Sequence, residues 1–265
     1  MARVLQKCFS NQGVSSLPLD RREFDVTDYD SIARIVGFFK PQIIIHTGAF
    51  TDVDGAEKNG LRAFMVNFLG TNNLVRICGD LGIDLLYLSS DYIFNGEKNL
   101  PYLEDDEPSP INTYGWSKLA GEYAIISKFT NYYIVRTSFL FGGEGDFIHR
   151  LINGLKSTVL RFSPGHFASP TYYSDLARAI SQLIKTRLYG IYHITNQGYC
   201  SRYQFAQHIL KKFKLPIDII PTPDSKNVAP RPRYSVLANL RWLKTGFPPL
   251  RPWQEALAEY LIDFH

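Results

Sequence analysis

Short apolar runs alternate with stretches of helical periodicity along the first half of this 265-residue chain. The runs QIIIHT (42–47), GIDLLYLSSD (82–91) and NYYIVRTSFLFG (131–142) are nearly continuous and rich in β-branched and aromatic residues. Such runs are typical of strands that are covered on both faces. Helical spacing occupies the segments 28–39, 61–81 and 114–128. This alternation predicts an α/β fold in which a doubly wound parallel sheet carries helices on both faces.

The pattern loosens after residue 142, where Gly142, Gly143 and Gly145 open a loop. A helix is expected near 146–156 and a short strand near 158–162. The segment SPTYYSDLARAISQLI then restores a long helix, and GIYHITN restores a strand. We predict two domains, a doubly wound one of residues 1–142 plus 169–196 and a smaller substrate domain of residues 143–168 plus 197–265.

Composition excludes several classes of protein. No apolar run approaches the roughly 18 residues of a membrane-spanning helix, and the N-terminus lacks the apolar core of a signal peptide. Cys8, Cys78 and Cys200 are widely separated, which predicts free thiols and no zinc site. The net charge of +4 is spread thinly, so no nucleic-acid surface is expected, although the cluster RPRYSVLANLRWLK suits an anionic small molecule. We expect a cytoplasmic protein with no metal, membrane or nucleic-acid partner.

The stretch NTYGWSKLAGEYA (112–124) places Tyr114 and Lys118 one helical turn apart. The strand LLYLSSDYIF brings Ser90 to its carboxyl end, where parallel sheets bind ligands. A phenol that a nearby cation makes more acidic, beside a hydroxyl that orients a carbonyl oxygen, suits proton delivery to a ketone. The spacing alone also fits an exposed aromatic over a lysine stem, and Ser90 is what favours an active site.

Six motifs together resemble the dTDP-4-dehydrorhamnose reductase family of extended short-chain dehydrogenases. They are SSDYIFNG, YLEDDEPSPINTYGWSKLAGE, RTSFLFG, SPTYYSDLARAI, GIYHITNQGYCSRYQFA and RPRYSVLANLRW, in order from about residue 13 onward. The resemblance implies a Rossmann-like dinucleotide-binding domain. It also implies that NADPH or NADH gives a hydride to the C4 ketone of dTDP-4-dehydro-L-rhamnose, which yields dTDP-L-rhamnose, a precursor of cell-surface polysaccharide.

The same resemblance assigns roles to individual residues. The catalytic hydroxyl falls on Ser90, the general acid on Tyr114, and the lysine that binds the nicotinamide ribose and lowers the pKa of Tyr114 on Lys118. The remaining substrate-side positions are Asp91, Tyr92, Phe139 in place of the family's tryptophan, and Arg231 with Arg233 for a diphosphate. The cofactor-side positions are Asp25, Val26, Thr47, Gly48, Ala49 and Asn67.

Four of these positions have a plainer interpretation. Asp25 also suits the start of a loop, and Asn67 a cap or a hydrogen bond in the core. His46, which stands beside the cofactor segment, also suits a packed histidine at a strand end. Arg231 also suits a solvated basic loop.

A dinucleotide fold uses an opening strand and a glycine-rich turn, whose N–H groups approach the pyrophosphate at a helix N-terminus. Aligned with the family on FDVTD and Gly13, Met1 falls just after that turn, so ARVLQKCFSNQG is expected to be the helix that follows it. The first strand and the glycine turn are thus predicted to be missing, and we expect weak pyrophosphate binding. Three explanations stay open. The sequence begins downstream of the natural start, the strands on either side of the missing strand pair directly with each other, or residues 1–19 supply a substitute strand.

The choice between NADH and NADPH stays open, because Asp20 favours a ribose hydroxyl whereas Arg21 and Arg22 favour a 2′-phosphate. Two alternatives to a reductase also stay open. One is a non-catalytic regulatory or scaffold relative, like the regulatory subunit of methionine adenosyltransferase, and the other is a truncated, inactive product. A homodimer is a further expectation.

Overall fold

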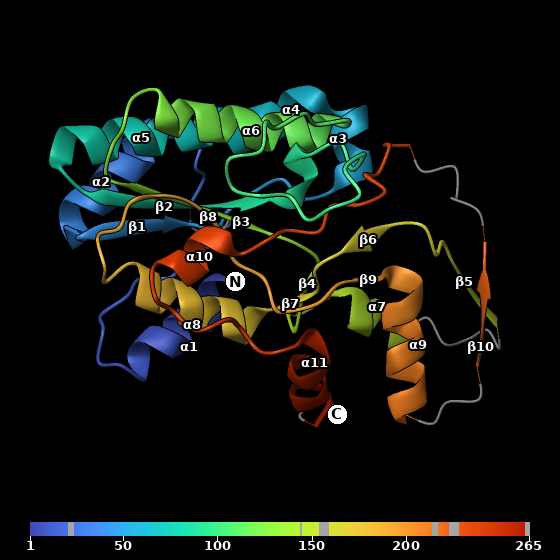
Figure 1. Cartoon of the computed structure of the whole chain (residues 1–265). Helices are drawn as coiled ribbons and strands as arrows, with labels where there is room; N and C mark the ends of the chain where they lie inside the picture. The colour runs from blue at the N-terminus through green and yellow to red at the C-terminus, as the bar shows by residue number, and fades with distance from the viewer. Residues whose placement is uncertain (21–23, 144, 154–158, 214–216, 223–227, 263–265) are drawn as a thin grey trace.

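The computed structural model describes residues 1–20, 24–143, 145–153, 159–213, 217–222 and 228–262 (Figure 1). Its centre is a sheet of four parallel strands in the order β1-β2-β3-β8. The strands are β1 (Ile43–His46), β2 (Asp84–Ser90), β3 (Tyr132–Thr137) and β8 (Gly190–His193). The predicted α/β class with a parallel sheet is confirmed.

Helices cover both faces of this sheet (Figure 1). On one face lie α2 (Tyr29–Phe39), α3 (Val53–Lys58), α4 (Gly60–Phe64), the π-helix η1 (Met65–Leu69), α5 (Gly70–Leu81) and α6 (Thr113–Ile126). On the other face lie α1 (Ala2–Ser10), α8 (Tyr173–Leu183) and α10 (Leu240–Lys244). The expectation that the first residues form a helix is therefore confirmed.

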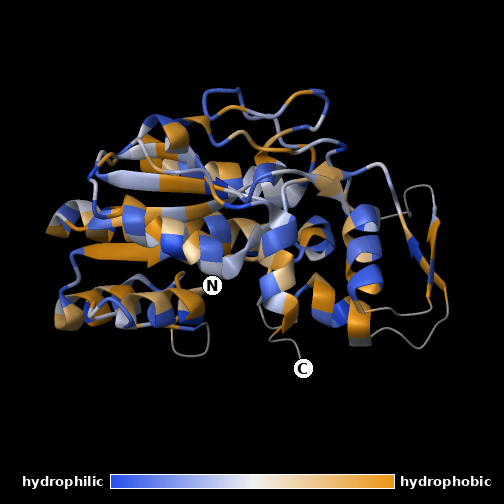
Figure 2. Ribbon diagram, turned by 60° about the horizontal axis from the view of Figure 1, so that its bottom comes forward, coloured by the Kyte–Doolittle hydropathy of each residue, from blue (hydrophilic) through white to orange (hydrophobic). Residues whose placement is uncertain are grey.

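The alternation of side chains along β2 divides the core into two layers. Leu85 and Tyr87 pack into the cluster under α2, α5 and α6, whereas Leu86 and Leu88 pack into the cluster that includes α1 and α8. Successive side chains of a strand point to opposite faces, so a strand covered on both sides is apolar at nearly every position. Figure 2 shows the result, with apolar strands between helices that are apolar on one side only.

A second lobe follows β3 and has its own aromatic core. Its elements are β4 (Leu140–Phe141), α7 (Phe147–Asn153), β5 (Val159–Phe162), β6 (Phe167–Ala168), β7 (Thr171–Tyr172), β9 (Cys200–Ser201), α9 (Arg202–Phe213), β10 (Asp218–Pro221) and α11 (Trp253–Ile262). Phe147, Phe205 and Trp253 are buried together there. Trp242 and Leu250, which the predicted boundaries assign to the substrate domain, instead pack into the core beside α1 and α8. The boundaries themselves stay a prediction.

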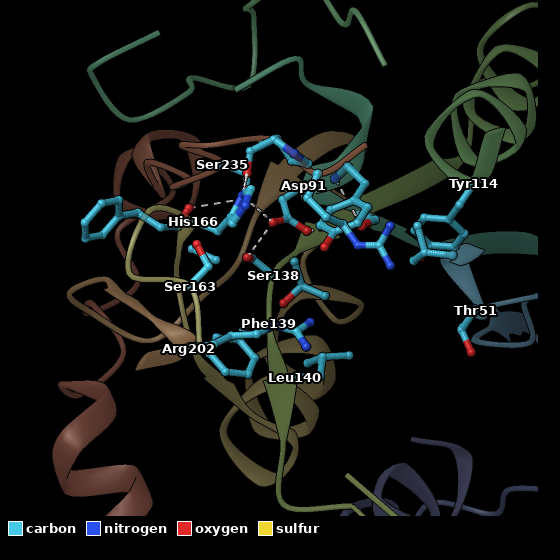
Figure 3. A pocket seen from close by; sticks show the side chains of 18 of the residues that line it. Thr51, Asp91, Tyr114, Ser138, Phe139, Leu140, Ser163, His166, Arg202 and Ser235 are labelled. Atoms are coloured by element: carbon cyan, nitrogen blue, oxygen red, sulfur yellow. Dashed lines mark hydrogen bonds between the residues drawn. The ribbon is translucent and has the colours of Figure 1, made fainter. Parts of the chain in front are cut away.

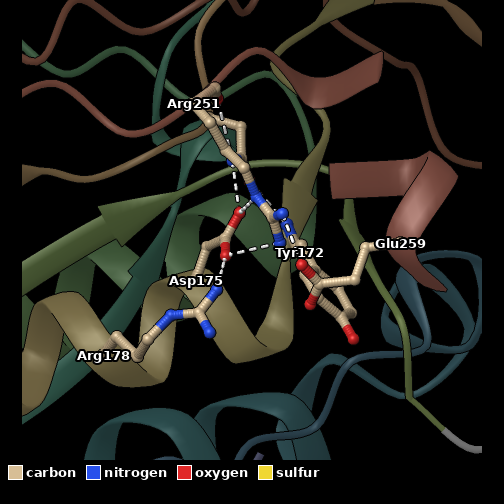
Figure 4. Close-up of polar contacts among 6 residues, drawn as sticks. Tyr172, Asp175, Arg178, Arg251 and Glu259 are labelled. Carbon is tan, nitrogen blue, oxygen red and sulfur yellow. Dashed lines mark hydrogen bonds and ion pairs between the residues drawn. The ribbon is translucent and has the colours of Figure 1, made fainter. Parts of the chain in front are cut away.

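Arg251 joins the two lobes through a buried carboxylate (Figure 4). Its guanidinium donates to Asp175 on α8 at 2.9 and 3.0 Å and to Glu259 on α11. Asp175 also accepts from Asn196 and pairs with Arg178. Burial alone would raise the pKa of Asp175, but the hydrogen bonds from Arg251 and Asn196 hold it below its ordinary value. The carboxylate is thus ionised and fixes α11 against α8.

The outer edge of β1 is not paired within the described residues. β1 bonds to β2 alone, and residues 1–20 form α1 and then an irregular segment, so they supply no substitute strand. A cavity of about 510 Å³ borders this edge, lined by parts of α1, residues 14–20 and residues 42–50. No other described strand has therefore moved in to pair with this edge of β1. None of the described helices has the length and apolarity needed to cross a membrane.

Candidate active site

A polar cavity of about 690 Å³ lies at the carboxyl ends of β2 and β3, between the sheet and the second lobe. Figure 3 shows Asp91 between Ser138 and Ser235, with Tyr114 of α6 on the opposite wall. Six predicted residues line this cavity: Ser90, Asp91, Tyr92, Tyr114, Phe139 and Arg231. The predicted catalytic hydroxyl, phenol and sugar-side residues thus meet at one place.

The start of α6 brings Tyr114 against the end of β2. Asn112 caps the helix by accepting a hydrogen bond from the Gly115 N–H at 2.8 Å. A Cβ on Gly115 would stand 2.2 Å from the Tyr92 carbonyl oxygen, so only glycine permits this close approach. The Tyr114 ring then lies edge-on to that of Tyr92, with 5.9 Å between the ring centres, and Tyr114 lines the same cavity as Ser90.

Lys118 lies one turn further along α6 and is 1% exposed. Its ammonium donates to the Leu88 carbonyl at 2.7 Å and lies 3.9 Å from the centre of the Tyr87 ring. Burial lowers the pKa of Lys118 to about 7, against the attraction of Glu122. That carboxylate itself is held by Arg136 in a buried ion pair.

The pKa of Tyr114 is raised by burial, and the hydrogen bond from Ser90 opposes that rise. The Lys118 ammonium donates to the β2 backbone, and its effect on the pKa of Tyr114 stays a prediction. Tyr114 is a protonated phenol at neutral pH, which is the state that a proton donor needs.

Positive charge gathers on the wall of the cavity formed by the second lobe and the segment before α10. Arg231 is bonded to Asp54 at 3.0 Å and to the Ala229 carbonyl at 2.8 Å. The Arg202 guanidinium lies 5.4 Å from the centre of the Phe139 ring. These cations suit an anionic ligand. Arg233 is exposed and does not line the cavity.

Phe139 occupies a strained backbone position at the cavity wall. Its φ is +40°, in the left-handed region that bulky residues rarely adopt. The ring packs against Phe205 at 4.8 Å and Phe147 at 5.8 Å. The aromatic cluster that holds Phe139 also positions the Arg202 guanidinium above it.

The cavity residues that sequence reasoning missed include Ser138, Arg161, Arg202 and Ser235. Three of them stand inside motifs that carried the family resemblance, in RTSFLFG, GIYHITNQGYCSRYQFA and RPRYSVLANLRW. Their place inside these motifs could thus have identified the three residues from the sequence. Arg161 lies in none of the motifs, so nothing in the sequence pointed to it.

The predicted cofactor-side residues lie mostly at the second cavity, beside β1. It is lined by Asp25, Val26, Thr47, Gly48 and Ala49. His46 lines it as well and is buried, its Nε2 has no partner among the described residues, and burial lowers its pKa to about 3. His46 is therefore a neutral, packed imidazole at the end of β1.

Asn67 is not brought to either cavity. It is fully buried, accepts from the Phe50 N–H at 2.8 Å, and donates to the Phe50 carbonyl and to Ser117. Its amide is therefore satisfied by protein, and a core hydrogen bond is the role that the structure gives it. Asp25 accepts from Thr27 and begins a turn, while still lining the cavity.

A nicotinamide dinucleotide fits this arrangement at one end. Ser90 and Tyr114 line the cavity where a nicotinamide would lie, whereas Lys118 is buried one helical turn from Tyr114 and lines neither cavity. No glycine-rich turn at a helix N-terminus is present among the described residues to cradle a pyrophosphate. Arg21 and Arg22, the predicted determinants of 2′-phosphate binding, lie outside those residues.

A hydroxyl, a phenol and a lysine at the carboxyl edge of a doubly wound parallel sheet define a reductase of the short-chain dehydrogenase class. The RmlD substrate binding domain family matches residues 1–265, and the chain belongs to that family.

Three similar proteins illustrate the match. The chain is 35% identical to the spore coat polysaccharide biosynthesis protein SpsK of Bacillus subtilis, over 95% of this chain and 89% of that protein. It is 34% identical to dTDP-4-dehydrorhamnose reductase of Mycolicibacterium smegmatis, over 98% and 81%. The crystal structure of dTDP-4-dehydrorhamnose reductase from Bacillus anthracis in complex with NADP superposes with a TM-score of 0.95 at 34% identity, covering 98% of this chain and 94% of that one.

Replacing Lys118 with methionine tests how far its buried charge lowers the stability of the folded protein. Because the folded protein lowers the pKa of Lys118 from 10.5 to about 7, the unfolded chain binds that proton more tightly. The penalty on folding is full below pH 7 and shrinks as the pH rises toward 10.5. We expect Lys118→Met to melt above the wild type at pH 7, by roughly 2–4 °C per kcal/mol regained, with a smaller gap at pH 9. Thermal melts of both, with exposed Lys58→Met as control, measure this, and a lower melting temperature throughout would contradict it.

Cofactor affinity tests the expectation drawn from the missing glycine turn. We expect the 265-residue chain to bind NADPH more weakly than the micromolar range, because the described residues offer the pyrophosphate no cradle of N–H groups. Isothermal titration calorimetry with NADPH measures the dissociation constant. A micromolar value on this chain would show that other groups replace the turn.

Proposed function

We propose that this chain is a nicotinamide-dependent reductase of a nucleotide-sugar ketone. Its substrate is dTDP-4-dehydro-L-rhamnose, its product is dTDP-L-rhamnose for polysaccharide synthesis, and its cofactor is NADPH in preference to NADH. The placement of Ser90 and Tyr114 in the lining of one 690 Å³ cavity carries this proposal. The relatives named dTDP-4-dehydrorhamnose reductase support the substrate, and the solved relative in complex with NADP supports the cofactor.

The roles of the residues follow from their protonation and position. The cofactor, when bound, supplies a hydride to C4 of the sugar. Tyr114 holds its proton at neutral pH and donates it to the ketone oxygen as that oxygen becomes an alcohol. Ser90 hydrogen-bonds the same oxygen and orients it. Lys118, fixed on the Leu88 carbonyl, stands where the nicotinamide ribose hydroxyls would lie.

The anionic part of the substrate is proposed to lie toward the second lobe. Arg202 and Arg161 line that side of the cavity, and forked guanidinium donors match diphosphate oxygens. Arg231 also lines the cavity, but Asp54 already takes one of its nitrogens. The diphosphate therefore competes with Asp54 for Arg231 and not for Arg202, which stacks on Phe139.

The built cavity favours the reductase over a non-catalytic scaffold relative. A scaffold has no need of a lysine that is only 1% exposed and whose ammonium is bonded to the Leu88 carbonyl, two residues before Ser90. We also propose the cytoplasm as the compartment. Cys8, Cys78 and Cys200 are all free, as a reducing compartment keeps them.

Tyr114→Phe tests the proton donor. Removing the phenolic proton is expected to lower kcat at least about 100-fold while leaving NADPH affinity within about twofold, because the ring keeps its packing. NADPH oxidation with dTDP-4-dehydro-L-rhamnose, at millimolar cofactor, measures this. Tyr123→Phe, on the exposed side of the same helix, is the matched control. Full activity in Tyr114→Phe would remove Tyr114 from its role, and an inactive wild type would overturn the reductase.

A homodimer is proposed through the exposed face of α4, η1 and α6. Large apolar side chains crowd this face, and the three elements contact one another. They are Leu61, Met65, Phe68, Leu69, Trp116 and Tyr123. Contiguous apolar surface of this kind is typical of a protein interface, and a second copy of the chain covers it symmetrically.

Leu61→Glu tests this face, since Leu61 is 75% exposed and lies outside the active site. A charge there is expected to convert dimer into monomer of 30.3 kDa in light scattering, with little change in the melting of the monomer. Phe38→Glu, at a position on α2 that is 91% exposed, is the control and is expected to leave the dimer intact. A monomeric wild type would overturn the homodimer.

A further inference from the structure

A carboxyl group without a cation stands directly behind the catalytic hydroxyl. Asp91 is 3% exposed, and its side-chain partners are three serine hydroxyls, beside its own backbone N–H. Its Oδ1 is 3.1 Å from the Ser90 Oγ, and its Oδ2 is 2.7 Å from the Ser138 Oγ and 2.5 Å from the Ser235 Oγ. No ion pair in the described part of the chain includes Asp91. A buried carboxyl of this kind is costly to ionise.

The hydrogen bonds of Ser90 can be counted. A serine hydroxyl has one proton to donate and two positions that accept. One acceptor position takes the Tyr92 N–H at 3.2 Å. The second acceptor position and the single proton remain for three possible partners: Asp91, Tyr114 and a ligand in the cavity.

If Asp91 were ionised, the Ser90 proton would point away from the substrate. A carboxylate only accepts, so Ser90, Ser138 and Ser235 would all donate to it. The single proton of Ser90 would then point out of the cavity. The open acceptor position of Ser90 would draw the phenolic proton of Tyr114, and neither group would donate to a ketone.

A neutral Asp91 gives the opposite arrangement. Its Oδ2 accepts from both Ser138 and Ser235, so the acid proton resides on Oδ1 and is donated to Ser90. Both acceptor positions of Ser90 are then filled, by this proton and by the Tyr92 N–H. The proton of Ser90 must point into the cavity, and Tyr114 keeps its own proton for the ketone.

We propose that Asp91 acts as a neutral carboxylic acid, a positioning residue whose Oδ1 proton turns the Ser90 hydroxyl toward the substrate ketone. This role differs from the sugar contact that the family resemblance implies, and its kinetic consequence rests on the proposed reductase. Asp91 itself exchanges no proton with the substrate. It fixes the direction in which Ser90 donates.

The surroundings of Asp91 agree with a bound proton. Burial raises its pKa, and the bonds from Ser235, Ser138 and Ser90 only partly oppose this. The other ionisable groups that line the cavity are the phenols of Tyr92, Tyr114 and Tyr173 and the guanidinium groups of Arg161, Arg202 and Arg231. His166 and Asp54 complete the set, and Lys118 lies behind Tyr114 with its ammonium on Leu88. None is hydrogen-bonded to the carboxyl of Asp91.

Infrared spectroscopy tests the proton without cofactor or substrate. The difference between wild type and Asp91→Asn is expected to show the carbonyl band of a protonated carboxylic acid at pH 7. The matched control is Asp106→Asn, because the Lys98 hydrogen bond holds the pKa of Asp106 below its ordinary value against burial. That difference spectrum is expected to show a carboxylate. A carboxylate band for Asp91 at pH 7 would overturn the proposal, whatever the activity of the chain.

Kinetics test the consequence. Asp91→Asn keeps an N–H donor for Ser90 and an oxygen acceptor for the other two serines, so kcat is expected to stay within about tenfold of the wild type. Asp91→Ala loses the donor, and kcat is expected to drop about 100-fold with KM changed less than threefold. Equal losses in both variants, each checked for a native melting transition, would show that charge is required and would overturn the proposal. An inactive wild type would instead count against the reductase and leave the infrared result standing.

Discussion

The close contact of α6 with the end of β2 is the constraint on which the rest of the site depends. Two glycines permit it: a Cβ on Gly115 would meet the Tyr92 carbonyl at 2.2 Å, and one on Gly121 would meet the Asn67 carbonyl and the Tyr87 hydroxyl at 2.6 Å. Any side chain at either position would force the helix outward. Tyr114 and Lys118 lie on this same helix, so the distance between the helix and the sheet sets the distance between the phenol and the Ser90 hydroxyl.

That contact places ionisable groups in a medium of low polarity, where their protonation is decided by burial. Tyr114 is kept protonated, Lys118 becomes easier to deprotonate, and Asp91 is held without a cation. The ion pair of Glu122 with Arg136 is the exception, because three short hydrogen bonds satisfy it in the core. The site thus combines one well-compensated pair with three groups whose protons are set by their surroundings.

Sequence periodicity predicted the elements well, because each strand and helix is determined mainly by its own spacing of apolar residues. The runs at 42–47 and 82–91 correspond to β1 and β2, and the spacing at 114–128 to α6. The network around Asp91 could not be predicted in this way, since Ser235 lies 144 residues from Asp91 in the chain and reaches it only through the second lobe. The rise in the pKa of Tyr114 could not be predicted either, because spacing shows neither the burial that causes it nor the bond of the Lys118 ammonium to the β2 backbone.

The unpaired edge of β1 has a consequence for the behaviour of the protein in concentrated solution. Ile43, Ile44 and Ile45 are only half-buried, although a central strand of this type is normally covered on both faces. A row of unsatisfied N–H and C=O groups beside apolar side chains is a template for any extended chain that meets it. Among the described residues, this four-residue strand is therefore an edge to which an extended segment of another chain can add.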